Sequence, residues 1–203
     1  MQELIRANSL EDAKITAYHI GFVLGPCINA SGRLDTAARS LALLNAKTKE
    51  EAARLAGDLT ALNQSRKALT EKGKEEAIRI IETTELKNDR VLVVYLPDCH
   101  ESLAGIIAGR IREKYHMPAF VLTGGETSAK GSGRSIESYS MYEELVKCAD
   151  LMIQFGGHPM AAGLSIEEKN IEEFRRRLNV NCTLMDEELR PKIVIDVPMP
   201  VSY

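Results

Sequence analysis

The sequence predicts an α/β fold in which a helical N-terminal segment and a long helix precede a unit of alternating strands and helices. Thr48 and Glu51 have the spacing of a capping box, and the chain then runs to about Glu82 with no proline. The continuous apolar run Val91–Leu96 has the composition of a buried strand. The fold class therefore follows from one long helical stretch and from the strand after it.

The first part of the chain is predicted to be helical with one interruption. Residues 1–24 form one or two short helices, and residues 36–44 form another. Gly-Pro and Ser-Gly dipeptides predict a loop over residues 25–35. Thirty-odd residues of helix from Thr48 span roughly 50 Å. Because its apolar seam is interrupted, we expect this helix to bridge two domains rather than to form a coiled coil.

The second part is predicted to alternate between strands, helices and glycine-rich loops. The triple arginine of the last helix is expected to be a solvated face rather than a binding patch. The weakly alternating stretch 192–197 predicts a final strand. In order after the first strand, we expect a helix over 103–115, a strand over 119–123, a loop over 129–135, a helix over 141–152, a loop over 155–163, a strand over 164–166 and a helix over 171–178.

Composition limits the kinds of function. The net charge is −3, so any phosphate contact must be local and built from a few residues. Aromatic residues make up 5% and tryptophan is absent, which disfavours recognition dominated by base stacking. There is no membrane-spanning apolar run and no signal-peptide pattern. Four widely spaced cysteines without a C-x-x-C pair are typical of reduced thiols in a cytoplasmic protein.

The stretch Ala129–Ser135 is the first candidate phosphate site. Two glycines flank Ser132, and Lys130 and Arg134 bracket the turn. Glycine lets the backbone approach a ligand closely, and a guanidinium offers a planar fork to phosphate oxygens. We predict that Ser132, Gly133, Arg134 and Lys130 hold a phosphate. The alternative is a flexible surface turn with one exposed arginine.

A second glycine cluster spans Phe155–Gly163 and contains Gly156, Gly157 and His158. We predict that the two clusters form one phosphate-binding wall. In this wall His158 donates to a phosphate oxygen or stabilises a leaving oxygen, which makes it the candidate catalytic residue. The alternative is a histidine that satisfies the carbonyls of its own loop.

Asn29 and Arg33 are further candidates from the predicted loop before the long helix. Either could reach a phosphate, or Asn29 could hold the loop and Arg33 could pair with the nearby Asp35. Of the other histidines, His100 is expected to cap or pack a helix, with facing the site as the alternative. His19 and His116 are expected to be structural or to lie on the surface. No Asp-x-Asp, His-x-Asp or Asp-His-His cluster occurs, so we assign no metal ligands.

Five stretches, in this order, resemble the RecJ family of single-strand-specific exonucleases, within the DHH phosphoesterase superfamily. The last two alone would indicate only a DHHA1 domain, which nanoRNases, cyclic-dinucleotide phosphodiesterases and alanyl-tRNA synthetases share. The first two make the RecJ family the specific match. The stretches are Gly25-Pro-x-Ile-Asn-Ala-x-Gly-Arg33, the long helix, His100-Glu101-x-x-x-Gly105-Ile-x-Ala-x-Arg110, Lys130-Gly-Ser-Gly-Arg-Ser135 and Gly156-Gly-His-Pro-Met-Ala-Ala-Gly163.

The resemblance implies a domain order and a reaction. Residues 1–47 would be the end of a DHH domain, 48–84 the connecting helix, 90–180 a DHHA1 domain with a mixed sheet, and 181–203 the start of an OB-fold domain. Such exonucleases remove nucleotides 5′ to 3′ from single-stranded DNA in repair and recombination, with Mn²⁺ or Mg²⁺ held by the DHH domain. Ser132 and Arg134 would hold the terminal 5′-phosphate, Arg33 would help across the cleft, and His158 would face the scissile phosphate.

Several features of this sequence depart from the family pattern. The metal-binding motifs are absent, so we expect the chain to be a fragment that binds single-stranded DNA without cutting it. Cys27 stands where the family commonly has Arg, and Ser102 where it commonly has Gly. An apolar stripe left exposed on the connecting helix would favour a dimer. The alternatives are part of a nanoRNase or cyclic-dinucleotide phosphodiesterase, or a non-catalytic nucleic-acid-binding module.

Overall fold

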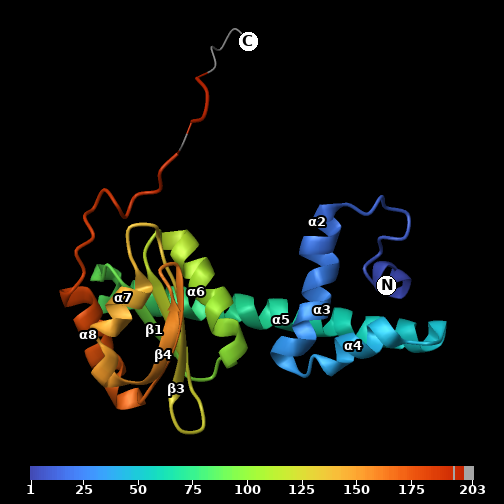
Figure 1. Cartoon of the computed structure of the whole chain (residues 1–203), viewed down its shortest axis with the longest axis horizontal. Helices are drawn as coiled ribbons and strands as arrows, with labels where there is room; N and C mark the ends of the chain where they lie inside the picture. The colour runs from blue at the N-terminus through green and yellow to red at the C-terminus, as the bar shows by residue number, and fades with distance from the viewer. Residues whose placement is uncertain (194, 199–203) are drawn as a thin grey trace.

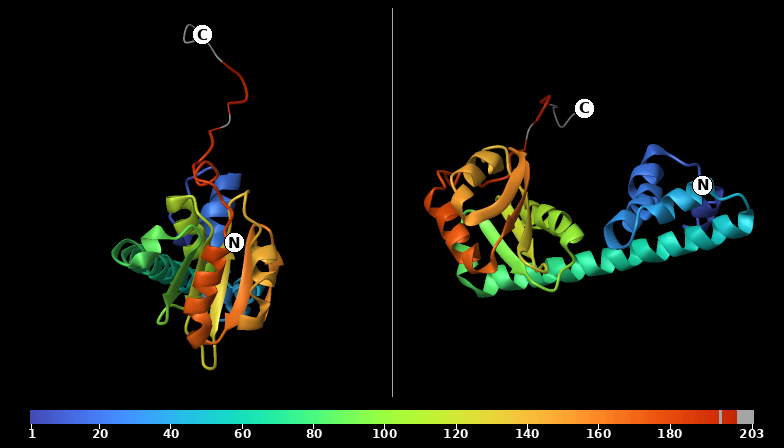
Figure 2. Two further views of the ribbon diagram at one scale, coloured as in Figure 1. Left: turned by 90° about the vertical axis from the view of Figure 1, so that its left-hand side faces the viewer. Right: turned by 60° about the horizontal axis from the view of Figure 1, so that its bottom comes forward.

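The computed structural model describes residues 1–193 and 195–198 and shows two units joined along one helix (Figure 1). This helix, α5 (Lys49–Thr83), has 35 residues. Both units lie on the same side of it, one toward each end (Figure 2, right). The Thr48 side chain accepts a hydrogen bond from the Glu51 amide at 3.2 Å, and Glu51 Oε2 accepts one from the Lys47 amide at 3.1 Å. The predicted long, capped helix is confirmed.

The N-terminal unit consists of short helices packed on the first half of α5. Their apolar side chains share one core with Leu55 and Leu59 of α5, and Leu4, Leu24 and Cys27 are almost completely buried in it. The elements are α1 (Gln2–Ala7), α2 (Ala17–His19), the π-helical turn η1 (Ile20–Leu24), α3 (Gly25–Leu34) and α4 (Ala38–Asn45).

The loop predicted over residues 25–35 is wrong, because these residues form α3. The π turn before it explains the error. The Gly25 amide bonds to the carbonyl of Ile20, and a Cβ at position 25 would lie 2.8 Å from that oxygen. Pro26 then falls in the first turn of α3, where the helix needs no amide donor. The Gly-Pro pair therefore lies within a continuous helical stretch, directly after the π turn, instead of breaking it.

The second unit is a five-stranded mixed sheet with helices on both faces, so the predicted α/β class is confirmed. The strand order is β1-β2-β3-β5-β4; β1 and β2 are parallel and the other neighbours antiparallel. The strands are β1 (Leu92–Leu96), β2 (Ala119–Thr123), β3 (Ala129–Arg134), β4 (Met152–His158) and β5 (Ala161–Ile166). The helices are α6 (Glu101–Tyr115), α7 (Met141–Val146) and α8 (Ile171–Val180), with 3₁₀ turns at Glu85–Asn88, Ala149–Leu151 and Glu168–Asn170.

Each face of the sheet has its own core. On one face, the end of α5 and helix α6 cover β1 and β2, with Ile81, Ile107 and Val121 buried between them. On the other face, α7 and α8 pack around Phe120 and Phe174, whose rings meet edge to face at 5.4 Å. Figure 2 shows the sheet with helices on both of its faces.

Both glycine-rich stretches predicted as loops are strands. Residues 129–134 form β3 in the middle of the sheet, and residues 156–158 end β4. The glycine at 133 is explained by packing, since a Cβ there would lie 2.5 Å from Met141 Sδ and 2.6 Å from Phe120 Cε1. The predicted helix over 141–152 ends earlier, because residue 152 already begins β4. Glycine punctuates turns in many sequences, but here it lets layers approach each other.

The remaining predictions for the second unit have mixed outcomes. Arg176 and Arg177 pair with Glu173 and Asp150, which agrees with a solvated face. Arg175 does not fit that expectation, because its side chain is only 17% exposed and pairs with Asp89, whose side chain is 13% exposed. The residues of 192–197 that the structure describes form no strand, and residue 194 lies outside the described part. All four cysteines are free. Within residues 1–193 and 195–198, no helix is both long and apolar enough to span a bilayer.

Candidate nucleic-acid interface

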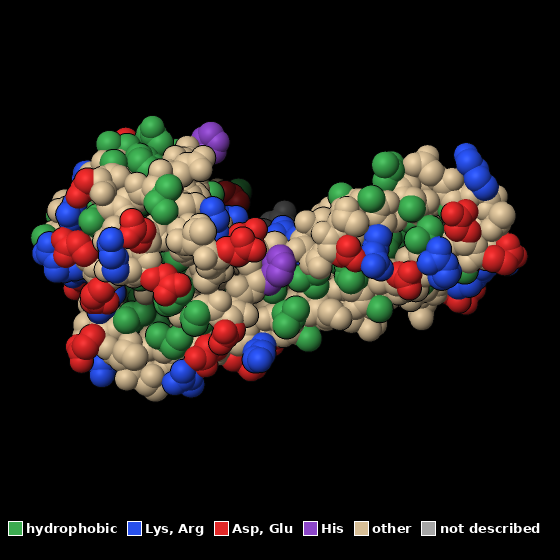
Figure 3. Space-filling model, turned by 90° about the horizontal axis from the view of Figure 1, so that it is seen from below, with side chains coloured by type: hydrophobic (Ala, Val, Ile, Leu, Met, Phe, Trp, Pro, Cys, Tyr) green, Lys and Arg blue, Asp and Glu red, His purple; other side chains and the backbone are tan. Residues whose placement is uncertain are grey.

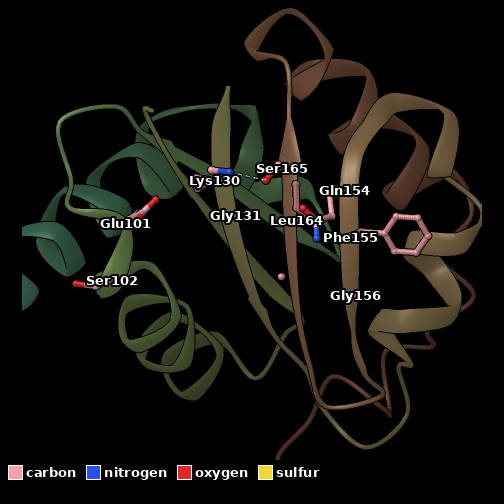
Figure 4. Close-up of a pocket in the computed structure, with 10 residues that line it drawn as sticks. Glu101, Ser102, Lys130, Gly131, Gln154, Phe155, Gly156, Leu164 and Ser165 are labelled. Atoms are coloured by element: carbon pink, nitrogen blue, oxygen red, sulfur yellow. Dashed lines mark hydrogen bonds between the residues drawn. The ribbon is translucent and has the colours of Figure 1, made fainter. Parts of the chain in front are cut away.

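A groove of about 390 Å³ lies on the α6 side of the sheet, over strands β3, β5 and β4. Helix α6 covers β2 and β3 but leaves β4 and much of β5 open, so Gln154, Gly156 and Gly163 are exposed. Figure 4 shows the first turn of α6 on one side of this groove and β4 on the other. The lining residues are Glu101, Ser102, Lys130, Gly131, Gln154, Phe155, Gly156, Gly163, Leu164 and Ser165.

The strand register brings the two predicted clusters side by side. Residues directly opposite each other in an antiparallel pair point to the same face of the sheet. Strand β5 lies between β3 and β4, so each row across the three strands takes one residue from each. The rows on the groove side are Lys130–Ser165–Gln154, Ser132–Gly163–Gly156 and Arg134–Ala161–His158. The wall predicted from sequence thus has the required adjacency, but a sheet builds it rather than two loops.

Ser132 and Arg134 lie together against α6. A Cβ on Gly105 would be 2.8 Å from Arg134 Nη2 and 3.2 Å from Ser132 Oγ. Arg134 Nη1 donates to the carbonyl of Gly133 at 2.7 Å. The bare backbone of α6 at residue 105 therefore makes the room in which the guanidinium and the hydroxyl lie side by side.

Arg33 reaches the same helix from the N-terminal unit. Its Nη1 donates to the Ser102 carbonyl at 2.8 Å, in the first turn of α6. His100 caps that turn, because its Nδ1 accepts from the Ser102 amide at 3.3 Å and lies 2.8 Å from Ser102 Oγ. The expected capping role of His100 is confirmed. One end of α6 is therefore approached by Arg33 from one unit and by Arg134 from the other.

The cations of this site are not neutralised by the chain. Among the described residues, Arg33, Lys130 and Arg134 form no ion pair with a carboxylate, although Glu101 also lines the groove. Lys130 Nζ donates to Ser165 Oγ at 3.0 Å, as Figure 4 shows. Charged donors that lack a charged partner can bind an anionic oxygen strongly. This part of the surface can therefore receive phosphate.

The other predicted residues differ in whether they lie on the groove side of the sheet. His158 is exposed at the end of β4, in the row of Arg134. Asn29 is exposed on α3. Positions 133 and 157 point to the opposite face of the sheet, since Cβ atoms there would meet Phe120 and Ala162 of the packed side. Gly133 and Gly157 thus shape the strands rather than the groove surface.

Sequence reasoning missed part of the groove. Gln154, Gly163 and Ser165 belong to its floor, and Gly105 makes room for Arg134. Alternation with a period of two along β4 and β5 would have found the floor, once the glycine stretches were recognised as strands. Gly105 could not be found this way, because its role depends on which face of α6 meets β3.

The described residues do not fit a metal ion. They contain no group of three or more His, Cys, Asp or Glu side chains that could hold one.

Comparisons with known proteins place this geometry in a family. Residues 88–182 match the DHHA1 domain family. The single-stranded-DNA-specific exonuclease RecJ of Salmonella typhimurium is 38% identical over 100% of this chain, and that of Bacillus subtilis is 33% identical over 97%. This chain is similar to RecJ proteins over nearly its whole length. It spans 37% and 25% of the length of these two RecJ proteins.

Solved RecJ structures agree with this similarity. The Mg²⁺ complex of Thermus thermophilus RecJ matches 88% of this chain at 29% identity with a TM-score of 0.77, over 28% of the RecJ chain. The Mn²⁺ complex of the same enzyme matches with a TM-score of 0.75, over 26% of its chain. The groove between α6 and β4 therefore lies in the DHHA1 part of a RecJ-type arrangement.

Proposed function

We propose that this chain is the substrate-binding part of a RecJ-type exonuclease that degrades single-stranded DNA from the 5′ end, in DNA repair and recombination. Ser132, Arg134 and Lys130 hold the terminal 5′-phosphate, and Arg33 adds a cation from the other unit. His158 faces the next, scissile phosphate. Cleavage then requires Mn²⁺ or Mg²⁺ held by residues outside this chain, and a cytoplasmic location fits the four free cysteines.

One observation carries the proposal. Arg134 and Ser132 lie side by side against Gly105, on a sheet face where Gly156 and Gly163 leave the floor bare. A guanidinium and a hydroxyl can both donate to phosphate oxygens. The missing Cβ atoms let the nucleotide behind that phosphate come close to the backbone. An end-on ligand with a doubly charged phosphate fits this arrangement better than the middle of a strand.

Binding of a short single-stranded DNA at low salt, with and without a 5′-phosphate, tests the proposal. A charge-assisted contact is worth about 1.5–3 kcal/mol, so the 5′-phosphate should tighten binding by roughly ten- to a hundredfold. Arg134→Ala should abolish that preference. The matched control is Arg176→Ala, which removes an exposed arginine paired with Glu173 on α8 and should change nothing.

The opposite result has a definite meaning. If the chain binds DNA equally well with and without a 5′-phosphate, the end-recognition proposal fails. A non-catalytic nucleic-acid-binding module is then the better description. If short RNA or a cyclic dinucleotide binds more tightly than the 5′-phosphorylated DNA, the nanoRNase or phosphodiesterase alternative replaces it.

A further inference from the structure

One stripe along α5 changes character between the two units. Its six residues follow one another at three- and four-residue spacing, so they share a face of the helix. One end of the stripe belongs to the N-terminal core and the other end to the core beneath α6, while the middle is polar. The stripe consists of Leu59, Asn63, Arg66, Thr70, Gly73 and Ala77.

The polar middle lies where α5 passes from one unit to the other. Asn63 Nδ2 donates to Cys27 Sγ of α3 at 3.4 Å, which fixes that end of the polar segment beneath α3. At the other end, a Cβ on Gly73 would lie 2.6 Å from Ile107 Cδ1 of α6. Arg66 lies between these two contacts. Figure 3 shows the two lobes of the molecule and the indentation between them.

The side chain of Arg66 is held in place by hydrogen bonds within α5, and it makes no hydrogen bond to another helix or strand among the described residues. Its Nε and Nη2 donate to Asn63 Oδ1 at 3.1 and 3.0 Å, and Asn63 is only 5% exposed. Both partners belong to α5, one turn apart. Most N–H donors of the guanidinium have no acceptor among the described residues, and none of its atoms is both buried and unpaired. These donors remain available to a ligand.

A second cation, Arg33, has no carboxylate partner in the described part of the chain and acts on Arg66. Arg33 interacts with Arg66 by charge repulsion, and burial together with Arg33 lowers the pKa of Arg66. Arg33 is fixed by its bond to the Ser102 carbonyl. Neither arginine forms an ion pair with a carboxylate within the described residues, whereas arginines elsewhere on α5, such as Arg54 and Arg79, do. Two fixed cations that repel each other favour an anion between them.

We propose that Arg66, positioned by Asn63 and assisted by Arg33, binds an internal phosphate of the nucleic-acid backbone at the floor between α3 and α6. The inference rests on the function proposed above and adds to it a contact that is independent of the 5′ end. A polynucleotide whose 5′-phosphate sits by Arg134 carries further phosphates at regular spacing along its backbone. Arg66 binds one of these phosphates and thereby positions the DNA across both units.

Arg66→Gln tests this, because it keeps polar donors and removes the charge. Its affinity for single-stranded DNA should fall about three- to tenfold, equally for 5′-phosphorylated and 5′-hydroxyl strands. The slope of log affinity against log salt should become shallower by roughly 0.7, the value for one lost phosphate contact on a single strand. The control Lys67→Gln removes the neighbouring exposed cation of α5 and should leave both quantities unchanged.

Asn63→Asp gives a second, independent test. The aspartate places a carboxylate against Arg66, which neutralises the site and keeps the oxygen that accepts from Arg66, while the donor to Cys27 Sγ is lost. This variant should reproduce the loss seen with Arg66→Gln and the shallower salt slope. Thermal unfolding of both variants shows that the loss is not a loss of fold.

The outcomes separate this inference from the proposed function. If Arg66→Gln matches wild type, or if Lys67→Gln weakens binding as much, the second phosphate site is overturned. If Arg66→Gln removes the preference for a 5′-phosphate, Arg66 belongs to the end pocket and the internal contact is also overturned. If wild type shows no such preference but Arg66→Gln still lowers affinity and slope, the internal contact stands and end recognition fails.

Discussion

The two faces of the sheet use glycine in opposite ways. On the α7 side, a Cβ on Gly133 would collide with Met141 and Phe120, so the chain itself fills the space. On the groove side, a Cβ on Gly156 would meet nothing within 4 Å, and one on Gly163 only the Gly131 carbonyl at 3.8 Å. Packing requires the first kind of glycine. Nothing in the described chain requires the second, so its space is available to a ligand.

This difference separates stability from binding on the same few strands. Substitutions on the closed face should lower the free energy of unfolding, and substitutions on the open face should lower affinity without unfolding the protein. A result that crosses this division would break the comparison.

The largest expected effect is that of Gly133→Val. Its Cβ would lie 2.5 Å from Met141 Sδ and 2.6 Å from Phe120 Cε1, and Phe120 is completely buried. Overpacking of this kind costs about 1–3 kcal/mol, and valine should reach or pass the upper end. Urea unfolding would measure the loss. Unchanged stability would show that the two layers can separate freely at this point.

Gly157→Ala should be somewhat less costly. Gly157 has φ +153°, a conformation that side chains rarely adopt, and a Cβ would lie 2.4 Å from the Ala161 carbonyl oxygen. Backbone strain of this kind costs about 1–3 kcal/mol. The thermal midpoint should fall accordingly. Because this residue lies next to His158, a drop in DNA affinity at temperatures where the variant is fully folded would instead indicate a role in the groove.

The same division explains what the sequence could predict. The long helix is encoded locally by the Thr48 cap, and β1 and β2 by apolar runs, so these elements were predictable. Strand β3 was not, since Gly-Ser-Gly has little intrinsic strand preference and its neighbours Phe120 and Met141 lie elsewhere in the chain. Helix α3 was not, because a Gly-Pro pair usually predicts a loop, whereas here it follows a π turn within a helical stretch.

The candidate site was predictable in its chemistry but not in its geometry. Ser132, Arg134 and His158 were found from residue types in short motifs, and the register of the sheet brings them to one side. The roles of Arg66 and Gly105 were not predicted, because they depend on which helix face meets the other unit or the sheet. Local patterns indicate which groups bind phosphate, whereas tertiary packing decides which of them meet.

Gly163→Val tests the open face. The variant has space for its side chain and should change the free energy of unfolding by no more than about 0.5 kcal/mol. Its isopropyl group would fill the floor between Ser132 and Gly156, so affinity for 5′-phosphorylated single-stranded DNA should fall about tenfold, or about 1.4 kcal/mol. Fluorescence anisotropy with a labelled oligonucleotide measures it.

The matched control is Gly57→Ala on α5, where a Cβ also meets nothing within 4 Å but the site is far from the groove along the helix. Alanine in a helix interior should raise stability by roughly 1 kcal/mol and leave affinity unchanged. If Gly163→Val binds DNA as wild type does, the bare floor is not a ligand surface. The claim that glycines on the groove side serve binding then fails.

The smallest expected effect comes from Gly105→Ala, where the two kinds of glycine meet. Its Cβ would press on Arg134 Nη2 at 2.8 Å and on Ser132 Oγ at 3.2 Å, which are the movable ends of side chains rather than backbone. The helix gains up to about 1 kcal/mol from alanine, which offsets the crowding, so stability should stay close to that of wild type. The guanidinium and the hydroxyl must shift, and the preference for a 5′-phosphate should fall roughly threefold, a loss of about 0.7 kcal/mol. Affinity for 5′-hydroxyl DNA should not change, which separates this effect from blocking of the floor. A full preference in this variant would show that the position of Arg134 against α6 does not determine recognition of the phosphate.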